Sequence, residues 1–109
     1  MKCVSTAVAV VTAVSTLLWT GCEEKKSDPA SKGRTVYMAH CIACHSPNPA
    51  VDGSVGPALQ GSALELIEAR VLRGEYPPGY SPKRTTHIMQ RLPLEQVDVE
   101  NLHAFLNAP

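Results

Sequence analysis

The stretch Tyr37-Met-Ala-His-Cys-Ile-Ala-Cys44, with His45 directly after it, decides how the rest of the chain is interpreted. Two cysteines three residues apart lie on one side of a helix, so their sulfurs can bond the two vinyl groups along one edge of a haem. The residue that follows then offers an imidazole to the iron. The sequence therefore predicts one covalently attached haem c, bound through Cys41 and Cys44, with His45 as an axial ligand of the iron.

Other uses of two cysteines and a histidine at this spacing fit the chain less well. A zinc site needs a fourth ligand and usually a second pair of Cys or His nearby, and the remaining cysteines, Cys3 and Cys22, are not near. A redox-active Cys-x-x-Cys pair belongs in an alternating pattern of strands and helices, which this sequence lacks. Two buried thiols beside a surface histidine would leave the spacing unexplained.

The start of the chain has the composition of an export signal. Lys2 is followed by the uncharged run from Val4 to Thr20, whose seventeen residues are fewer than the roughly 20 that a membrane-spanning helix needs. We therefore expect residues 1–21 to be a signal peptide and the protein to be exported to the periplasmic side of a bacterial membrane.

The end of this run, Leu17-Leu-Trp-Thr-Gly-Cys22, resembles the lipobox of bacterial lipoproteins, although Trp19 stands where that family usually has leucine. The resemblance implies that Cys22 is acylated, becomes the first residue of the mature protein and anchors it to the membrane. Ordinary cleavage nearby and an uncleaved anchor are the alternatives. The stretch from Glu23 to Ser27 is charged and lacks apolar periodicity, so we expect residues 22–27 to form a flexible tether before a domain over residues 28–109.

Charge and cysteine usage narrow the function classes further. Loss of the signal peptide removes only Lys2 from the ten basic residues, which leaves nine against ten acidic residues and a formal charge of −1. Strong binding of nucleic acid is therefore not expected. Because the leader, the lipid and the haem account for all four cysteines, no disulfide framework is expected either.

Three segments carry helical signals. Asp28-Pro29 is a good helix start, and the apolar residues from there to Cys44 share one face of a helix that Pro47 ends. Ser62 to Glu65 has the pattern of a capping box, and Gly74 that of a C-terminal stop. The charged face of this second helix, which includes Arg70, is expected to be solvated. The last helix is expected from about Leu94 to Asn107.

These features together resemble the class I cytochromes c over about Asp28 to Ala108. The resemblance implies a small all-α cytochrome c fold of three main helices, in which the first and last cross tightly at Gly33 and Phe105 packs on the first. It also implies that Gly56-Pro57 wraps the histidine side of the haem and that the Pro57 carbonyl accepts the ring N–H of the ligand. Such a bond would fix the tautomer and the orientation of His45.

The second axial position decides the chemistry. Two of the candidates, Met38 and His40, belong to the helix that already carries the thiols, and His103 lies on the last helix away from its apolar stripe, which leaves Met89 and His87. Class I cytochromes supply a methionine just before the last helix, where Met89 stands, although they usually follow it with proline rather than with a residue such as Gln90. We expect Met89 to be the ligand and keep His87 as the alternative.

The loop from Glu75 to Thr86 is rich in proline, tyrosine and basic residues and is expected to be irregular. Its Tyr76, Tyr80 and Arg84 are candidates for hydrogen bonds to haem propionates, since such bonds to a charged group are favourable. The same three side chains could equally be surface residues.

Ligation by histidine and methionine raises the reduction potential and closes the iron to substrates. The expected function is therefore the transfer of single electrons between redox partner proteins, by a protein that is not an enzyme. Two alternatives stay open. The chain could be the haem subunit of a larger dehydrogenase or oxidase, or a haem enzyme or gas-binding protein with an open sixth position.

Overall fold

A computed structural model describes residues 26–109, so the expected signal peptide and Cys22 lie outside the described residues. The regular structure of the described part is helical: α1 spans Pro29–His40, α2 Leu64–Glu68, η1 Ala69–Arg73 and α3 Gln96–Leu106. No strand occurs between residues 26 and 109, and the predicted all-α fold is confirmed. Over the same residues, no helix combines the length and the apolar character that a membrane span requires.

The start of α1 follows the sequence signals. The side chain of Asp28 accepts a hydrogen bond from the Ser31 amide at 2.9 Å, and proline occupies the first helical position. These contacts satisfy an amide group that would otherwise lack a partner and pre-set the backbone of the first turn.

The end of α1 differs from the prediction, because the helix stops at His40 rather than near Pro47. The last bond of the helical ladder runs from the Cys41 amide to the Tyr37 carbonyl at 2.9 Å. The amides of Cys44 and His45 then both donate to the Cys41 carbonyl, at 3.2 and 2.9 Å. The Cys-x-x-Cys-His motif therefore forms its own turn at the end of the helix rather than lying within it.

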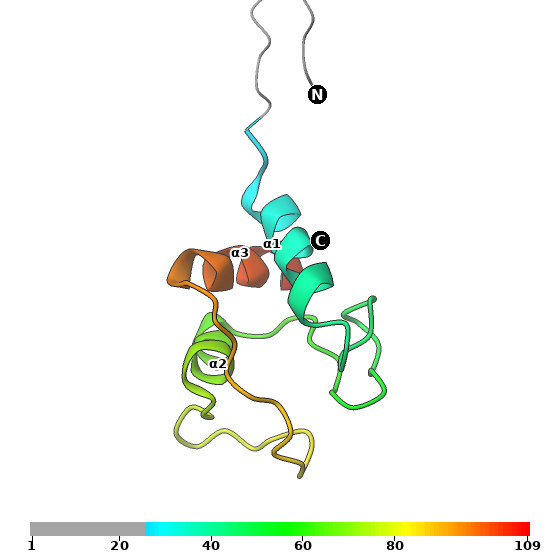
Figure 1. Ribbon diagram of the computed structural model, residues 1–109, viewed down its shortest axis with the longest axis vertical. Helices are drawn as coiled ribbons and strands as arrows, with labels where there is room; N and C mark the ends of the chain where they lie inside the picture. The colour runs from blue at the N-terminus through cyan, green and yellow to red at the C-terminus, as the bar shows by residue number, and fades with distance from the viewer. Residues whose placement is uncertain (1–25) are drawn as a thin grey trace, which may run out of the picture.

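Helices α1 and α3 cross at a glycine, as expected from the sequence (Figure 1). Gly33 is buried against the backbone of Asn101, and the rings of Tyr37 and Phe105 lie 5.3 Å apart between their centroids. The Tyr37 side chain is fully buried, and its hydroxyl donates to the Ser46 carbonyl at 2.6 Å. This crossing fixes α1 against α3 and so positions the cysteine motif, which directly follows α1.

Helix α2 does not begin with the predicted capping box. Ala63 is the N-cap residue, while the buried Ser62 hydroxyl donates to the Leu59 carbonyl at 2.6 Å. Ser62 therefore lies one residue before the N-cap, where its hydroxyl closes the turn before the helix instead of capping it. The predicted stop at Gly74 is confirmed, since this residue takes a left-handed conformation with φ of 72° that glycine adopts without strain.

Helix α3 begins at Gln96, two residues later than expected at Leu94. The reason is that the Asp98 carboxylate accepts a hydrogen bond from the Glu95 amide at 3.0 Å, which fixes the first turn at that point. The buried core lies where the three helices meet and consists of Tyr37, Ile67, Val71, Val99, Leu102 and Leu106.

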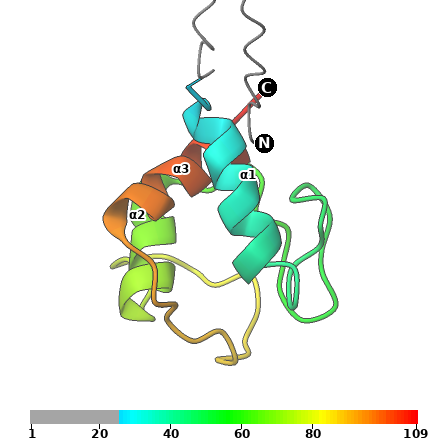
Figure 2. The same cartoon turned by 45° about the horizontal axis from the view of Figure 1, so that its top comes forward.

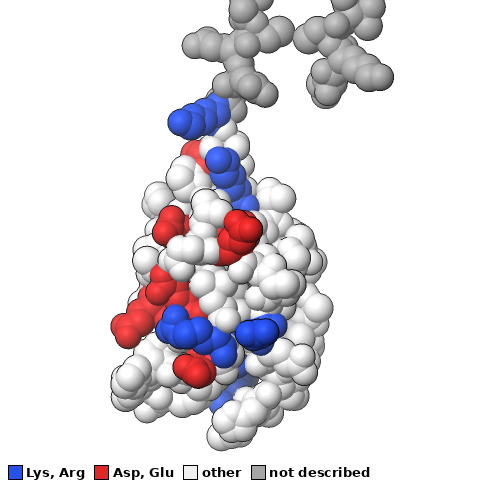
Figure 3. All heavy atoms as spheres, turned by 60° about the vertical axis from the view of Figure 1, so that its left-hand side comes forward, with Lys and Arg blue, Asp and Glu red and all other residues white. Residues whose placement is uncertain are grey.

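Two irregular segments complete the domain. One follows the cysteine motif and leads to α2, and the other runs from η1 round the bottom of the view in Figure 2 to α3. On the face that α2 and the start of α3 form, acidic and basic side chains are interspersed rather than gathered into a field of one sign (Figure 3).

Candidate functional site

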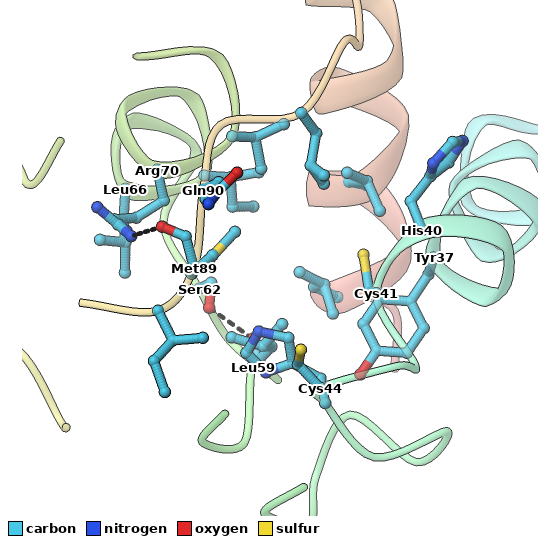
Figure 4. A pocket seen from close by; sticks show the side chains of 17 residues that line it. Tyr37, His40, Cys41, Cys44, Leu59, Ser62, Leu66, Arg70, Met89 and Gln90 are labelled. Carbon is cyan, nitrogen blue, oxygen red and sulfur yellow. Dashed lines mark hydrogen bonds between the residues drawn. The ribbon is translucent and has the colours of Figure 1, made fainter. Parts of the chain in front are cut away.

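A cavity of about 250 Å³ lies between the three helices and the segment that precedes α3. Four residues predicted to bind a cofactor, Cys41, Cys44, His45 and Met89, line this one cavity. Figure 4 shows the two cysteine sulfurs on one side of it and the Met89 side chain on another. Most of the remaining wall is apolar and is formed by Leu59, Leu66, Ile67, Val71, Leu102 and Leu106.

The imidazole of His45 is buried, with 8 % of the residue exposed. Its Nδ1 atom lies 2.8 Å from the carbonyl oxygen of Pro57. Because a carbonyl oxygen can only accept, the hydrogen bond requires the proton to be on Nδ1, which leaves a lone pair on Nε2. The ring is therefore held in the tautomer that can ligate a metal ion through Nε2.

The loop that carries Pro57 is fastened to the cysteine motif through its backbone. The amides of Val55 and Gly56 both donate to the Cys44 carbonyl, at 3.2 and 2.9 Å. A Cβ atom on Gly56 would lie only 2.4 Å from Cε1 of the His45 ring, so glycine allows the loop to lie directly against the imidazole. This loop is expected from the resemblance to the class I cytochromes c and from its position after the motif.

Met89 is half-buried, and hydrogen bonds to η1 hold the segment that carries it. Arg70 donates from Nη2 to the Met89 carbonyl at 2.9 Å, and the Leu92 amide donates to the Val71 carbonyl at 2.8 Å. The rival ligand His87 is exposed and is not among the described residues that line the cavity. Of the candidates set aside, His40 lines the cavity from an exposed position, Met38 packs against the core and His103 is half-buried.

The predicted propionate contacts lie elsewhere among the described residues. The ring of Tyr76 stacks on that of Tyr80, with centroids 5.5 Å apart and an angle of 10° between the planes. Arg84 forms an ion pair with Asp52 at 3.1 Å. In the part of the chain that the structure describes, these three side chains do not line the cavity, and their role toward propionates stays a prediction.

Comparison with known proteins places this arrangement in a family. The sequence model of the family "Cytochrome c" matches residues 30–108, which include the whole cavity wall and every helical residue except Pro29. The chain belongs to the cytochrome c family. Comparisons with curated proteins and with solved structures returned no match. Membership makes the chain a c-type cytochrome, whose function in general is electron transfer by covalently bound haem.

The residues of this cytochrome fit the haem that the family implies. Burial raises the pKa of the Cys41 thiol to about 11, so this sulfur is uncharged at neutral pH. A dry site of this kind suits an uncharged thioether better than the thiolate that zinc requires. Within residues 26–109, moreover, no three His, Cys, Asp or Glu side chains gather as a metal-binding group. Cys41, Cys44 and His45 would hold the haem, and the apolar wall suits its macrocycle.

One residue of the site was not expected from the sequence. Arg70 was assigned to a solvated face of the second helix, but in this cytochrome it is half-buried and lines the cavity. Its position could have been recognised, because it follows Ile67 by three residues and Leu66 by four, and such spacings place side chains on one helix face.

An exposed contact joins the two irregular segments. Asp52 accepts from the Ala58 amide at 2.7 Å and pairs with Arg84, while Lys83 donates to the Ala58 carbonyl at 3.1 Å. The bond from the Ala58 amide, together with the charges of Arg84 and Lys83, lowers the pKa of Asp52. The contribution of the ionised Asp52 carboxylate to stability is therefore present at a pH above its unfolded pKa of about 3.9. It is lost as the pH falls through the lower pKa of the folded protein.

We predict that Asp52→Asn lowers the melting temperature at neutral pH and that its difference from the native protein shrinks as the pH falls below about 4. Thermal unfolding of both proteins at neutral and acidic pH measures this difference. Glu100→Gln, which changes an exposed acid on α3, is the control. A difference between Asp52→Asn and the native protein that stays constant over the whole pH range would contradict the assignment.

Proposed function

We propose that this chain is an exported monohaem class I cytochrome c that carries single electrons between redox partner proteins, with His45 and Met89 as the axial ligands of the iron. The observation that supports it most is the presence of an imidazole and a thioether on the wall of one apolar cavity with both thiols of the attachment motif. When bound there, haem supplies the one-electron couple of its iron.

The chain's own residues have separate tasks in this function. Pro57 holds the imidazole of His45 through Nδ1 and so leaves Nε2 as the ligating atom. Met89 offers a thioether, which stabilises the reduced iron relative to a second imidazole and occupies the position that a substrate would need. The leucine, isoleucine and valine side chains of the wall limit the access of water, which also influences the reduction potential.

Carbon monoxide tests whether Met89 closes the sixth position. We expect the ferrous native protein to bind carbon monoxide slowly, because the thioether must leave first, and the Met89→Ala variant to bind it much faster. His87→Ala, which changes an exposed residue two positions away, is the control and should behave like the native protein.

Two outcomes of this experiment would contradict the proposal. Native protein that binds carbon monoxide as fast as Met89→Ala would have an open position, as in a haem enzyme or a gas-binding protein. Faster binding in His87→Ala, with no change in Met89→Ala, would assign the sixth position to the histidine instead.

A lipid anchor at Cys22 belongs to the same proposal. It is supported by the uncharged run that ends at this cysteine and by the exposed residues 26–28. The chain enters the domain at the N-terminal end of α1, whereas the cysteine motif follows the C-terminal end (Figure 1). An anchor attached there would leave the cavity side of the domain facing away from the point of attachment.

Intact mass of the native protein tests the anchor and the number of haems together. We expect one covalent haem and a diacylglyceryl group on a chain that begins at Cys22. A chain that begins at another residue, or that carries no lipid, would contradict the anchor, and a mass without haem would contradict the attachment site.

A further inference from the structure

Arg70, at the cavity wall, makes three contacts, and one of them is to the segment that carries Met89. Its Nη1 donates to the Gly74 carbonyl at 2.7 Å, and its Nη2 donates to the Met89 carbonyl at 2.9 Å. Its guanidinium carbon lies 4.3 Å above the centre of the Tyr76 ring, which in turn stacks on Tyr80. Figure 4 shows the hydrogen bond from Arg70 to the Met89 backbone at the cavity edge.

The π-helix provides a second attachment next to the first. In η1 the amides of both Gly74 and Glu75 bond to the Ala69 carbonyl, which is wider spacing than an α-helix has. The carbonyl of Val71 instead accepts the Leu92 amide at 2.8 Å. Two neighbouring residues of η1 therefore hold residues 89–92 at both ends. The Arg70 side chain bonds to the Met89 carbonyl, and the Val71 carbonyl accepts the Leu92 amide.

The arginine is suited to this task by its shape. Its planar guanidinium presents several N–H groups in a fixed fork, so one side chain can hold the end of η1 and the Met89 carbonyl at once while lying flat on an aromatic ring. Hydrogen bonds from a charged donor are also shorter and stronger than neutral ones. A lysine presents its donors from a single nitrogen atom and could not reproduce the fork.

We propose that Arg70 is a positioning residue for Met89: it fixes the backbone from which the thioether reaches the iron, and so determines how readily another ligand displaces the sulfur. This inference rests on the proposed function, because it requires Met89 to be the axial ligand. Arg70 acts through the Met89 carbonyl. The predicted consequence is a weaker hold of the sulfur, with the fold unchanged, when the fork is lost.

Imidazole binding to the ferric holoprotein tests this role. We expect the dissociation constant for imidazole to fall about tenfold in Arg70→Met, which corresponds to about 1.4 kcal/mol. Imidazole can bind as a neutral molecule, so loss of the arginine charge does not by itself attract it. Arg70→Lys keeps the charge without the fork and should show the same change, and it also provides a second variant should Arg70→Met not fold.

The matched control is Arg73→Met, which removes an exposed arginine from the same π-helix and should bind imidazole like the native protein. Arg70 variants that bind imidazole no more tightly than Arg73→Met would overturn the inference. So would a change in Arg70→Met that Arg70→Lys does not share, because charge rather than the fork would then be responsible.

Met89→Leu in the same titration separates this inference from the proposed function. If Met89→Leu binds imidazole more tightly than the native protein and the Arg70 variants do not, only the positioning role fails. If Met89→Leu binds it no more tightly than the native protein, Met89 is not the ligand and both fail. If Met89→Leu binds imidazole more tightly than the native protein, and adding Arg70→Met to it causes no further change in the dissociation constant, both are supported.

Discussion

Replacing Gly33 with alanine is expected to lower the melting temperature of the holoprotein by roughly 10 °C. The added Cβ atom would lie 1.8 Å from the Asn101 carbonyl oxygen, and this oxygen belongs to the backbone of α3 and cannot rotate away. Helices α1 and α3 must therefore move apart. Overpacking costs about 1–3 kcal/mol and occasionally more, of which the better helix propensity of alanine offsets up to about 1 kcal/mol, and each kcal/mol corresponds to roughly 4–8 °C in a domain of this size.

Thermal unfolding followed by circular dichroism measures the effect, with Lys32→Ala as the control on an exposed position of the same helix. Surface changes of that kind stay within about 0.5 kcal/mol. If Gly33→Ala melted at the same temperature as Lys32→Ala, the close crossing of the two helices would not be what holds the first helix in place.

Replacing Gly56 with alanine is expected to weaken the bond between His45 and the iron. The new Cβ atom would lie 2.5 Å from Nδ1 of the ring and would push the imidazole away from the Pro57 carbonyl that orients it. Loss of such an orienting contact costs about 10–100-fold in metal affinity. We therefore expect a substantial high-spin fraction of the ferric protein at neutral pH, measured by electron paramagnetic resonance.

Ser54→Ala is the matched control, because Ser54 is an exposed residue of the same loop. It should leave the ferric protein low-spin. A fully low-spin Gly56→Ala protein would mean that the loop can retreat without disturbing the ring, and that Pro57 is not needed to hold it.

The parts of the fold that follow from local chemistry were predictable from the sequence. Asp28-Pro29 and Gly74 mark a helix start and a helix end because each satisfies a backbone requirement that its neighbours cannot change. The glycine at the helix crossing was predictable only through the resemblance to the class I cytochromes c. Its role depends on a carbonyl in α3, 68 residues further along the chain.

The predictions that were wrong concern residues whose partners lie outside their own helix. Ser62 has the right spacing for a capping box, but its hydroxyl bonds to the Leu59 carbonyl. The first helix ends at His40, and the Cys41 carbonyl accepts two amides from the cysteine motif in a separate turn. Arg70 is expected in solvent because it is charged, but two of its partners, the Met89 carbonyl and the Tyr76 ring, lie beyond its own helix.

The attachment motif was predictable because thiols and imidazole at this spacing have few other uses, whereas Met89 depends on tertiary structure. Sequence left Met89 and His87 as rivals two residues apart. The structure distinguishes their surroundings, since Met89 lines the cavity and is held by Arg70, while His87 is exposed. The link from Met89 to the iron is the central claim of the proposed function.

The ferric absorption spectrum of the Met89→Leu variant tests this claim most directly. A methionine sulfur on ferric haem iron gives a charge-transfer band, which we expect in the native protein and in His87→Ala but not in Met89→Leu. Survival of the band in Met89→Leu, or its absence from the native protein, would contradict ligation by Met89.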